Sequence, residues 1–169
     1  MDVQQQTKRA LLSHFLAALA YRTQKALRGA PDGFGDFDAG NGVRTPHELI
    51  VHMRSVLGYA RTFIIGNVYP RPVPVEFEAD VTAFHEMLAD LSSRLTAGEH
   101  LNGITEEILL QGPFADAMTH AGQLAMLRRL HSEPIAPENF IFAKISDENL
   151  TQYQADPEAP DPGWTPDHK

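Results

Sequence analysis

The chain has 169 residues, a length typical of one domain with a sizeable core. Its composition, with 43% hydrophobic, 21% charged and 8% aromatic residues, is that of an ordinary soluble globular protein. Fourteen Lys and Arg against 22 Asp and Glu give a formal net charge of −8, and no basic run is present. Electrostatics therefore argue against nucleic acid as a partner.

The absence of cysteine excludes disulfides, thiolate metal ligands and a cysteine nucleophile. The N-terminal stretch MDVQQQTKRA is polar where a signal peptide would be apolar, and no apolar run approaches the roughly 20 residues that a membrane span requires. We therefore expect a cytoplasmic protein that does not bind membranes.

Two helices are predicted in the first half of the chain. Residues 2–28 have helical spacing, with Leu11, Phe15, Ala18 and Leu19 forming the apolar stripe. A Gly- and Asp-rich loop follows at 29–42. The second helix is predicted to begin at TPHE, where Thr45 is a good N-cap, Pro46 suits the first helical position and Glu48 completes a capping box. It should end near Gly66.

The second half continues the helical pattern after a Pro-rich crossing loop, NVYPRPVPV, at 67–75. A third helix is predicted at 78–97, with an apolar stripe that includes Phe84 and Leu88. The last helix is predicted in two pieces, 104–110 and 113–131, because Pro113 cannot sit inside a helix without a kink.

The fold class that follows is all-α, an up-and-down-type four-helix bundle with long loops. We expect the bundle domain to span residues 1–150 and a Pro- and Asp-rich C-terminal tail to span 151–169. The composition of the tail alone is typical of disorder. We nevertheless expect an irregular, docked tail, with Trp164 as its anchor.

Three polar side chains fall on the faces that the helices need for their core. His52 lies three residues after Leu49 and four before Val56, and Asp116 and His120 lie one turn apart on the inner side of the last helix. Two His and one carboxylate from two helices can form a three-ligand metal site with open coordination positions. The competing interpretation is a helix-surface hydrogen bond beside a satisfied core histidine.

The remaining six histidines divide into two groups. Two of them lie on long helices and can also face inward, whereas four are expected at the surface, in turns or in the tail. The first group is His14 and His85, and the second is His47, His100, His131 and His168.

Two local motifs resemble the DinB/YfiT-like four-helix family, whose members are described as metalloenzymes. TPHELIVHM (45–53) resembles the start of the family's second helix, and GPFADAMTHAGQLAMLRRL (112–130) resembles its last helix. The most specific element is His-x-Gly-Gln at 120–123. The order and lengths of the expected helices also agree over roughly residues 1–131.

The resemblance implies a divalent metal, since family members usually hold one with three His. By position these ligands correspond to His52, Asp116 and His120, so this chain departs from the family pattern at Asp116. A carboxylate can still bind Zn, Ni, Mn or Fe, and it shifts preference toward harder ions. Loss of the metal, with a His–Asp polar pair left behind, is the alternative.

The resemblance further implies a metal-dependent enzyme acting on a small molecule. Related proteins include transferases that add a low-molecular-weight bacterial thiol to electrophiles, and thiol-dependent isomerases; a hydrolase that activates water is equally compatible with three ligands. Gln123 is expected to orient a ligand or support His120, and Glu48 is a candidate base with helix capping as the simpler role. A homodimer is implied because related bundles commonly pair. The rival interpretation is a non-catalytic small-molecule-binding or stress-response bundle with a metal-free polar network.

Overall fold

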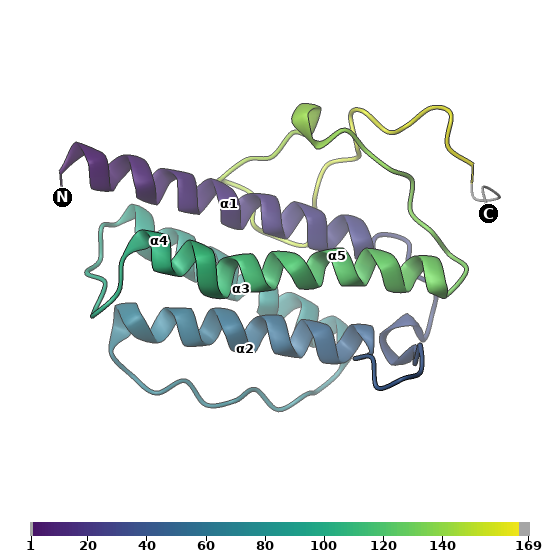
Figure 1. Cartoon of the computed structure of the whole chain (residues 1–169), viewed down its shortest axis with the longest axis horizontal. Helices are drawn as coiled ribbons and strands as arrows, with labels where there is room; N and C mark the ends of the chain where they lie inside the picture. Colours follow the sequence, from purple (N-terminus) through teal and green to yellow (C-terminus); the bar gives the residue numbers. More distant parts are fainter. Residues whose placement is uncertain (1, 166–169) are drawn as a thin grey trace.

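The computed structural model describes residues 2–165, and within them the chain is helical, without a strand longer than an isolated bridge. The predicted all-α class is confirmed. Every helix in this part of the chain is too short or too polar to cross a bilayer. In chain order the elements are α1 (Val3–Leu27), η1 (Phe34–Asp36), α2 (Pro46–Ile65), α3 (Phe77–Thr96), α4 (Glu106–Leu109), η2 (Leu110–Phe114), α5 (Ala115–Leu130) and η3 (Phe140–Phe142) (Figure 1).

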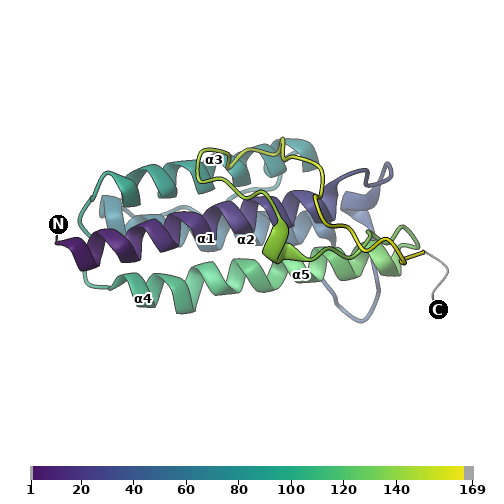
Figure 2. The same ribbon diagram turned by 90° about the horizontal axis from the view of Figure 1, so that it is seen from above.

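The long helices form a bundle in which α1 and α2 occupy opposite corners. Both α1 and α2 pack against α3 and α5, and the view from above shows α1 lying between α3 and α5 (Figure 2). Each long helix contributes fully buried side chains to one shared core, for example Leu16, Ile50, Leu88 and Leu124. The predicted stripe of α3 is confirmed, since Phe84 and its neighbours on that face are buried.

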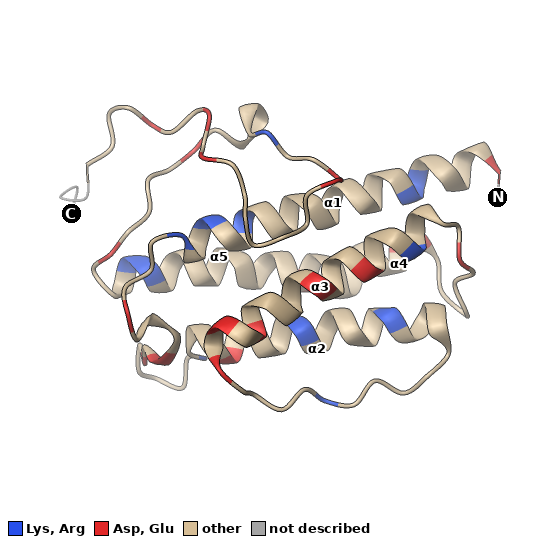
Figure 3. Ribbon diagram, turned by 180° about the vertical axis from the view of Figure 1, so that it is seen from behind, with Lys and Arg blue, Asp and Glu red and all other residues tan. Residues whose placement is uncertain are grey.

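The expected up-and-down connectivity is wrong at one junction, because α2 and α3 run parallel. Arg54, near the middle of α2, pairs with Asp80 in the first turn of α3, and Arg61 pairs with Asp90 further along both helices. The chain therefore runs up, down, down and up through α1, α2, α3 and α5 (Figure 1). Basic positions on α2 consequently lie beside acidic positions on α3 (Figure 3).

The loop between α2 and α3 makes this connectivity possible. A 20-residue helix such as α2 is about 30 Å long. The 11 residues from 66 to 76 span about 34 Å if they stay as extended as a polyproline helix. Proline at 70, 72 and 74 favours that conformation, so the loop can return the chain along the full length of α2.

The predicted break at Pro113 is also corrected. The chain stays helical from Glu106 to Leu130, and Pro113 lies in η2, a π-helical turn. A π-turn holds one more residue than an α-turn, which accommodates a residue without an N–H inside the helical run. The extra residue also rotates the face that α5 presents relative to α4.

The stripe predicted for α1 is only partly right. Leu11 is 66% exposed and Phe15 half-buried, whereas Leu12, Leu16 and Leu19 are buried. Spacings of four and three residues place those three leucines on one face of the helix. That face meets the core, so the correct stripe begins one residue later than expected.

The C-terminal segment docks on the bundle, as expected, but its contacts start before Trp164. Leu150 is buried, and its carbonyl oxygen accepts a hydrogen bond from Nδ1 of His85 at 2.8 Å. Arg28 donates to the carbonyl oxygens of Gln154 and Ala155. Trp164 is half-buried, and residues 166–169, with His168, lie outside the described residues.

Of the other histidines, His47 and His131 are more buried than expected. His85 faces inward, as allowed for, but His14 is exposed and contacts Asp147. His47, expected at the surface, is partly buried against Asp80, and His131 is half-buried against two phenylalanines.

Asp80 is a fully buried carboxylate that ties three segments together. It accepts hydrogen bonds from Nε2 of His47 at 2.7 Å and from the backbone N–H of Val75 at 3.0 Å, and it pairs with Arg54. Burial by itself raises the pKa of Asp80, but the hydrogen bonds and the charge of Arg54 outweigh it and the pKa is lowered. The charged carboxylate therefore holds α2 and the crossing loop to α3.

Replacing this carboxylate is expected to destabilise the protein severely. Asp80→Ala leaves the partly buried Arg54 and His47 without their partner, and breaking a buried pair by removing one member costs about 3–5 kcal/mol. Urea unfolding measures the loss. Asp90→Ala is the matched control, because Asp90 is one-third exposed and its ion pairs should contribute at most about 1 kcal/mol. Equal losses in the two variants would contradict the role given to Asp80.

Because the pKa of buried His85 is lowered, we expect the protein to lose stability in acid. Burial, only partly offset by the hydrogen bond to Leu150, lowers the pKa of His85 from 6.5 to about 4. The unfolded chain therefore binds a proton that the folded chain does not between those values, and stability present above pH 6.5 is lost as the pH falls toward 4. A shift of this size corresponds to about 3 kcal/mol. His85→Asn keeps a donor for Leu150 but does not titrate, so urea unfolding of this variant should show a shallower pH dependence than wild type; equal slopes would contradict the assignment.

Candidate metal centre

The start of α2 positions His52. The side chain of Thr45 accepts the N–H of Glu48, and the carboxylate of Glu48 accepts the N–H of Thr45 at 2.8 Å, which completes the predicted capping box. Pro46 occupies the first turn. Because the helix begins at a defined residue, His52 lies two turns inside it, on the side that packs against α5.

Asp116 and His120 come from the first two turns of α5, directly after the π-turn of η2. Their one-turn spacing places both side chains on the same face, as the sequence predicted. That face meets α2, where the rings of His52 and His120 lie nearly perpendicular with centroids 4.7 Å apart. The fold therefore brings together all three residues that the sequence singled out as ligands.

The metal-ligand atoms of the three side chains lie close to one another. Nε2 of His120 lies 3.4 Å from Oδ1 of Asp116, and Nε2 of His52 lies 3.7 Å from Oδ2 of Asp116. One ligand atom from each residue lies within 4.8 Å of the others. Ligands that share a tetrahedral ion at 2.0–2.2 Å lie about 3.3–3.6 Å apart. The 3.4 Å between His120 and Asp116 falls in this range, and the 3.7 Å between His52 and the other carboxylate oxygen lies just beyond it.

Gln123 determines which nitrogen of His120 faces Asp116. Nδ1 of His120 lies 2.6 Å from Oε1 of Gln123, an amide oxygen that can only accept, so Nδ1 carries the proton. In the neutral ring, Nε2 is then a bare lone pair; it is buried without a hydrogen-bond partner among the described residues. A lone pair that faces a carboxylate oxygen is satisfied by a proton or a metal ion between them, or by a water molecule that donates to both.

His52 is suited to binding as a neutral ligand. Burial is the largest cause that lowers the pKa of His52, and the positive charges of Arg44 and Arg71 and the neighbouring His120 lower it further, against the opposite pull of Asp116. A neutral imidazole is the form that binds metal. The side chains of His120, His52 and Asp116 are 9%, 31% and 48% exposed, so the site is closed on the His120 side and open beside Asp116.

An open groove of about 700 Å³ begins at Asp116. Ser55 and Tyr59 of α2 line one side, Thr119 of α5 and Gln111 of η2 the other. These hydroxyl and amide groups lie among apolar atoms, which is the mixture that small-molecule sites commonly use.

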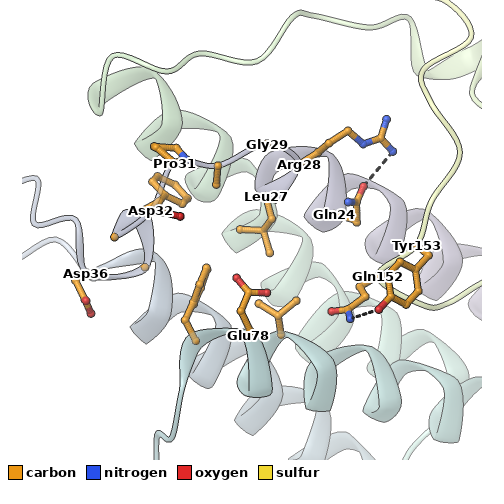
Figure 4. Close-up of a pocket in the computed structure, with 16 residues that line it drawn as sticks. Gln24, Leu27, Arg28, Gly29, Pro31, Asp32, Asp36, Glu78, Gln152 and Tyr153 are labelled. Atoms are coloured by element: carbon orange, nitrogen blue, oxygen red, sulfur yellow. Dashed lines mark hydrogen bonds between the residues drawn. The ribbon is translucent and has the colours of Figure 1, made fainter.

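A second cavity, of about 630 Å³, lies between the end of α1, the following loop, the start of α3 and the tail (Figure 4). Its arginine, Arg28, is bound by Gln24, by Asp156 and by tail carbonyls. Glu78 points into it near Leu27 (Figure 4). None of the three candidate ligands lines this cavity.

The two supporting residues named from the sequence have different positions. Gln123 lies within hydrogen-bonding distance of Nδ1 of His120, and its supporting role stays a prediction. Glu48 is exposed, its carboxylate caps α2, and it is not part of the three-residue group. The sequence did not single out Arg44 and Arg71, whose charges act on His52. The only hint was an arginine between two prolines in the crossing loop.

Comparison with known proteins yields no match for this chain among family models, curated proteins or solved structures. The likeness to the DinB/YfiT-like family therefore depends on the two local motifs, and the site depends on its own geometry.

In Gln123→Ala, the neutral ring of His120 should no longer be held in the tautomer that carries its proton on Nδ1. In metal-free protein at pH 8, the nitrogen chemical shifts of wild-type His120 should show the proton on Nδ1, because the Gln123 oxygen accepts it. In Gln123→Ala the proton should redistribute toward Nε2, where Asp116 can accept it. An unchanged tautomer in the variant would show that Gln123 does not position the ring. Gln24→Ala, remote from the site, is the control.

Proposed function

We propose that the protein is a metal-dependent enzyme of the DinB-like kind in which His52, Asp116 and His120 hold one divalent ion. The observation that carries the proposal is the unpartnered Nε2 of His120 facing the Asp116 carboxylate, since both atoms are electron-pair donors. A carboxylate among the ligands favours Zn, Ni, Mn or Fe over softer ions.

Thiol transfer is the reaction class we favour, with hydrolysis as its close relative. A divalent ion in such a site lowers the pKa of a coordinated thiol or water, which supplies a nucleophile at neutral pH. The chain has no cysteine, so a thiol would arrive as a low-molecular-weight cosubstrate. An electrophilic small molecule is the expected second substrate.

The residues of the chain contribute binding and orientation. Gln123 fixes His120 through Nδ1, and this kind of support raises the basicity of a histidine ligand. Ser55, Tyr59 and Thr119 offer hydroxyl groups along the groove that opens at Asp116, where they can bind a polar substrate group. The exposed side of Asp116 gives substrate access, while the buried side of His120 excludes water.

The rival function is a non-catalytic small-molecule-binding or stress-response bundle, and the same geometry supports it if His120 carries a second proton. His120 and Asp116 would then form a metal-free ion pair inside a polar network. Such a network contributes to folding, so losing one partner would cost about 1–3 kcal/mol.

Metal content and chelation test the proposed function. Protein purified without a nickel column should contain about one equivalent of a divalent metal by elemental analysis. His52→Ala, Asp116→Asn and His120→Ala should each lose it. A chelator should lower the melting temperature of wild type by about 5–10 °C, since a ligand at 100 times its Kd contributes about 2.7 kcal/mol to stability.

His14→Ala is the matched control, because His14 is an exposed histidine that contacts a carboxylate outside the site. It should keep both the metal and the chelator response. If wild type contains no metal, and its melting temperature does not change when Zn²⁺, Mn²⁺ or chelator is added, the proposal is overturned in favour of the polar network.

A further inference from the structure

We propose that the groove that begins at Asp116 binds the second substrate as an uncharged, elongated molecule with an aromatic end, which packs on Tyr59 two helical turns from the metal centre. This inference rests on the proposed function, because the other end of the molecule would reach the ion held by His52, Asp116 and His120. It names a substrate class that the three ligands alone do not specify.

The groove follows the line of contact between α2 and α5, which run antiparallel beside each other (Figure 1). Tyr59 lies seven residues after His52, so it shares the face of His52 at about 10 Å along the helix axis. Gly112 of η2 lies eight residues before His120, about 12 Å along the other side of the groove. A ligand that extends from the metal centre to the far end is therefore about 10 Å long.

Beyond the metal centre, the side chains that line the groove carry no charge. Among the described residues that line it, Asp116 alone is charged at neutral pH. The side chains of Ser55, Tyr59 and Gln111 form no hydrogen bond with another described residue, so their hydroxyl and amide groups are free to bind a ligand. A charged group here would lose part of its hydration without gaining a partner of opposite charge. The part of the substrate that lies in the groove is therefore uncharged.

Tyr59 supplies an aromatic surface at the far end of the groove. Its side chain lines the groove, and the residue is 59% exposed. The ring of Phe63 meets the ring of Tyr59 edge to face, with centroids 5.0 Å apart, which holds Tyr59 against α2. Apolar surface beside it comes from Val56, Pro113 and Ala115. An aromatic ring packed on Tyr59 gains more than its buried area alone provides, so this end of the groove favours an aromatic group.

Gly112 leaves the far end of the groove open. A Cβ atom at this position would meet no atom from another part of the chain within 4 Å. The backbone of Gly112 does not have the positive φ that would require glycine, so a larger side chain can adopt the same helical conformation. Such a side chain would fill part of the groove near Tyr59. Gly122 of α5 has equally open surroundings but does not line the groove, which makes it a matched control position.

Titration of Zn²⁺-loaded protein with benzylideneacetone, followed by NMR chemical shifts, tests the inference. This uncharged probe has an aromatic ring at one end and an electrophilic conjugated carbonyl group at the other, and the chain has no cysteine that could capture it. Gly112→Leu and Tyr59→Ala should each weaken binding about tenfold or more. Gly122→Leu should bind the probe like wild type. An analogue with a carboxylate on the ring should bind about tenfold more weakly than the probe.

Zn²⁺ binding to wild type and to His120→Ala, measured first by calorimetry, separates the two proposals. Zn²⁺ that fails to bind, or binds equally well to His120→Ala, overturns the proposed function and this inference with it. Zn²⁺ bound through His120, together with chemical shifts that the probe leaves unchanged, overturns the inference alone. So does probe binding that Gly112→Leu weakens no more than Gly122→Leu, or a carboxylate analogue that binds as tightly as the uncharged probe.

Discussion

The buried carboxylate of Asp80 is the interaction on which the rest of the structure depends. A charge this far from water is stable only with full hydrogen bonding, and His47, Arg54 and the N–H of Val75 supply it. These donors come from α2 and the crossing loop, so their convergence fixes α3 parallel to α2. The hydrogen bond from Val75 to Asp80 also fixes the end of the crossing loop beside α2. Through it, the connectivity of the bundle and the path of the crossing loop share one cause.

The candidate metal centre has the opposite character. Each oxygen of Asp80 has a hydrogen-bond donor. His120 and Asp116, in contrast, face each other as two acceptors. Gln123 accepts the ring proton of His120 at Nδ1, so the neutral ring has no proton at Nε2 to donate to Asp116. A folded chain tolerates such a pair where a cation completes it. The difference between a satisfied and an unsatisfied carboxylate separates the Asp80 ion pair from the candidate metal centre in this bundle.

Much of the fold could be predicted because its signals are local. The capping box at Thr45 and the apolar stripe of α3 depend on residues three or four apart, and both are confirmed. The same spacing placed Asp116 and His120 on one face, and the inward position of His52 brought the third residue in. Errors occurred where the local signal was ambiguous. Leu11 and Leu12 both fit a helical stripe, and only packing against α3 and α5 selected Leu12.

The sequence by itself determined the long helices, the capping box of α2 and the three polar residues on inner faces, because helix formation and side-chain direction follow from short-range geometry. Only the tertiary structure decided that α2 and α3 run parallel and that Pro113 sits in a π-turn. These features depend on contacts between residues far apart in the chain, such as Val75 with Asp80 and Tyr69 with Gly58. Spacing along one helix carries no information about which loop will cross it, because that choice is made by packing and by the need to satisfy buried charge.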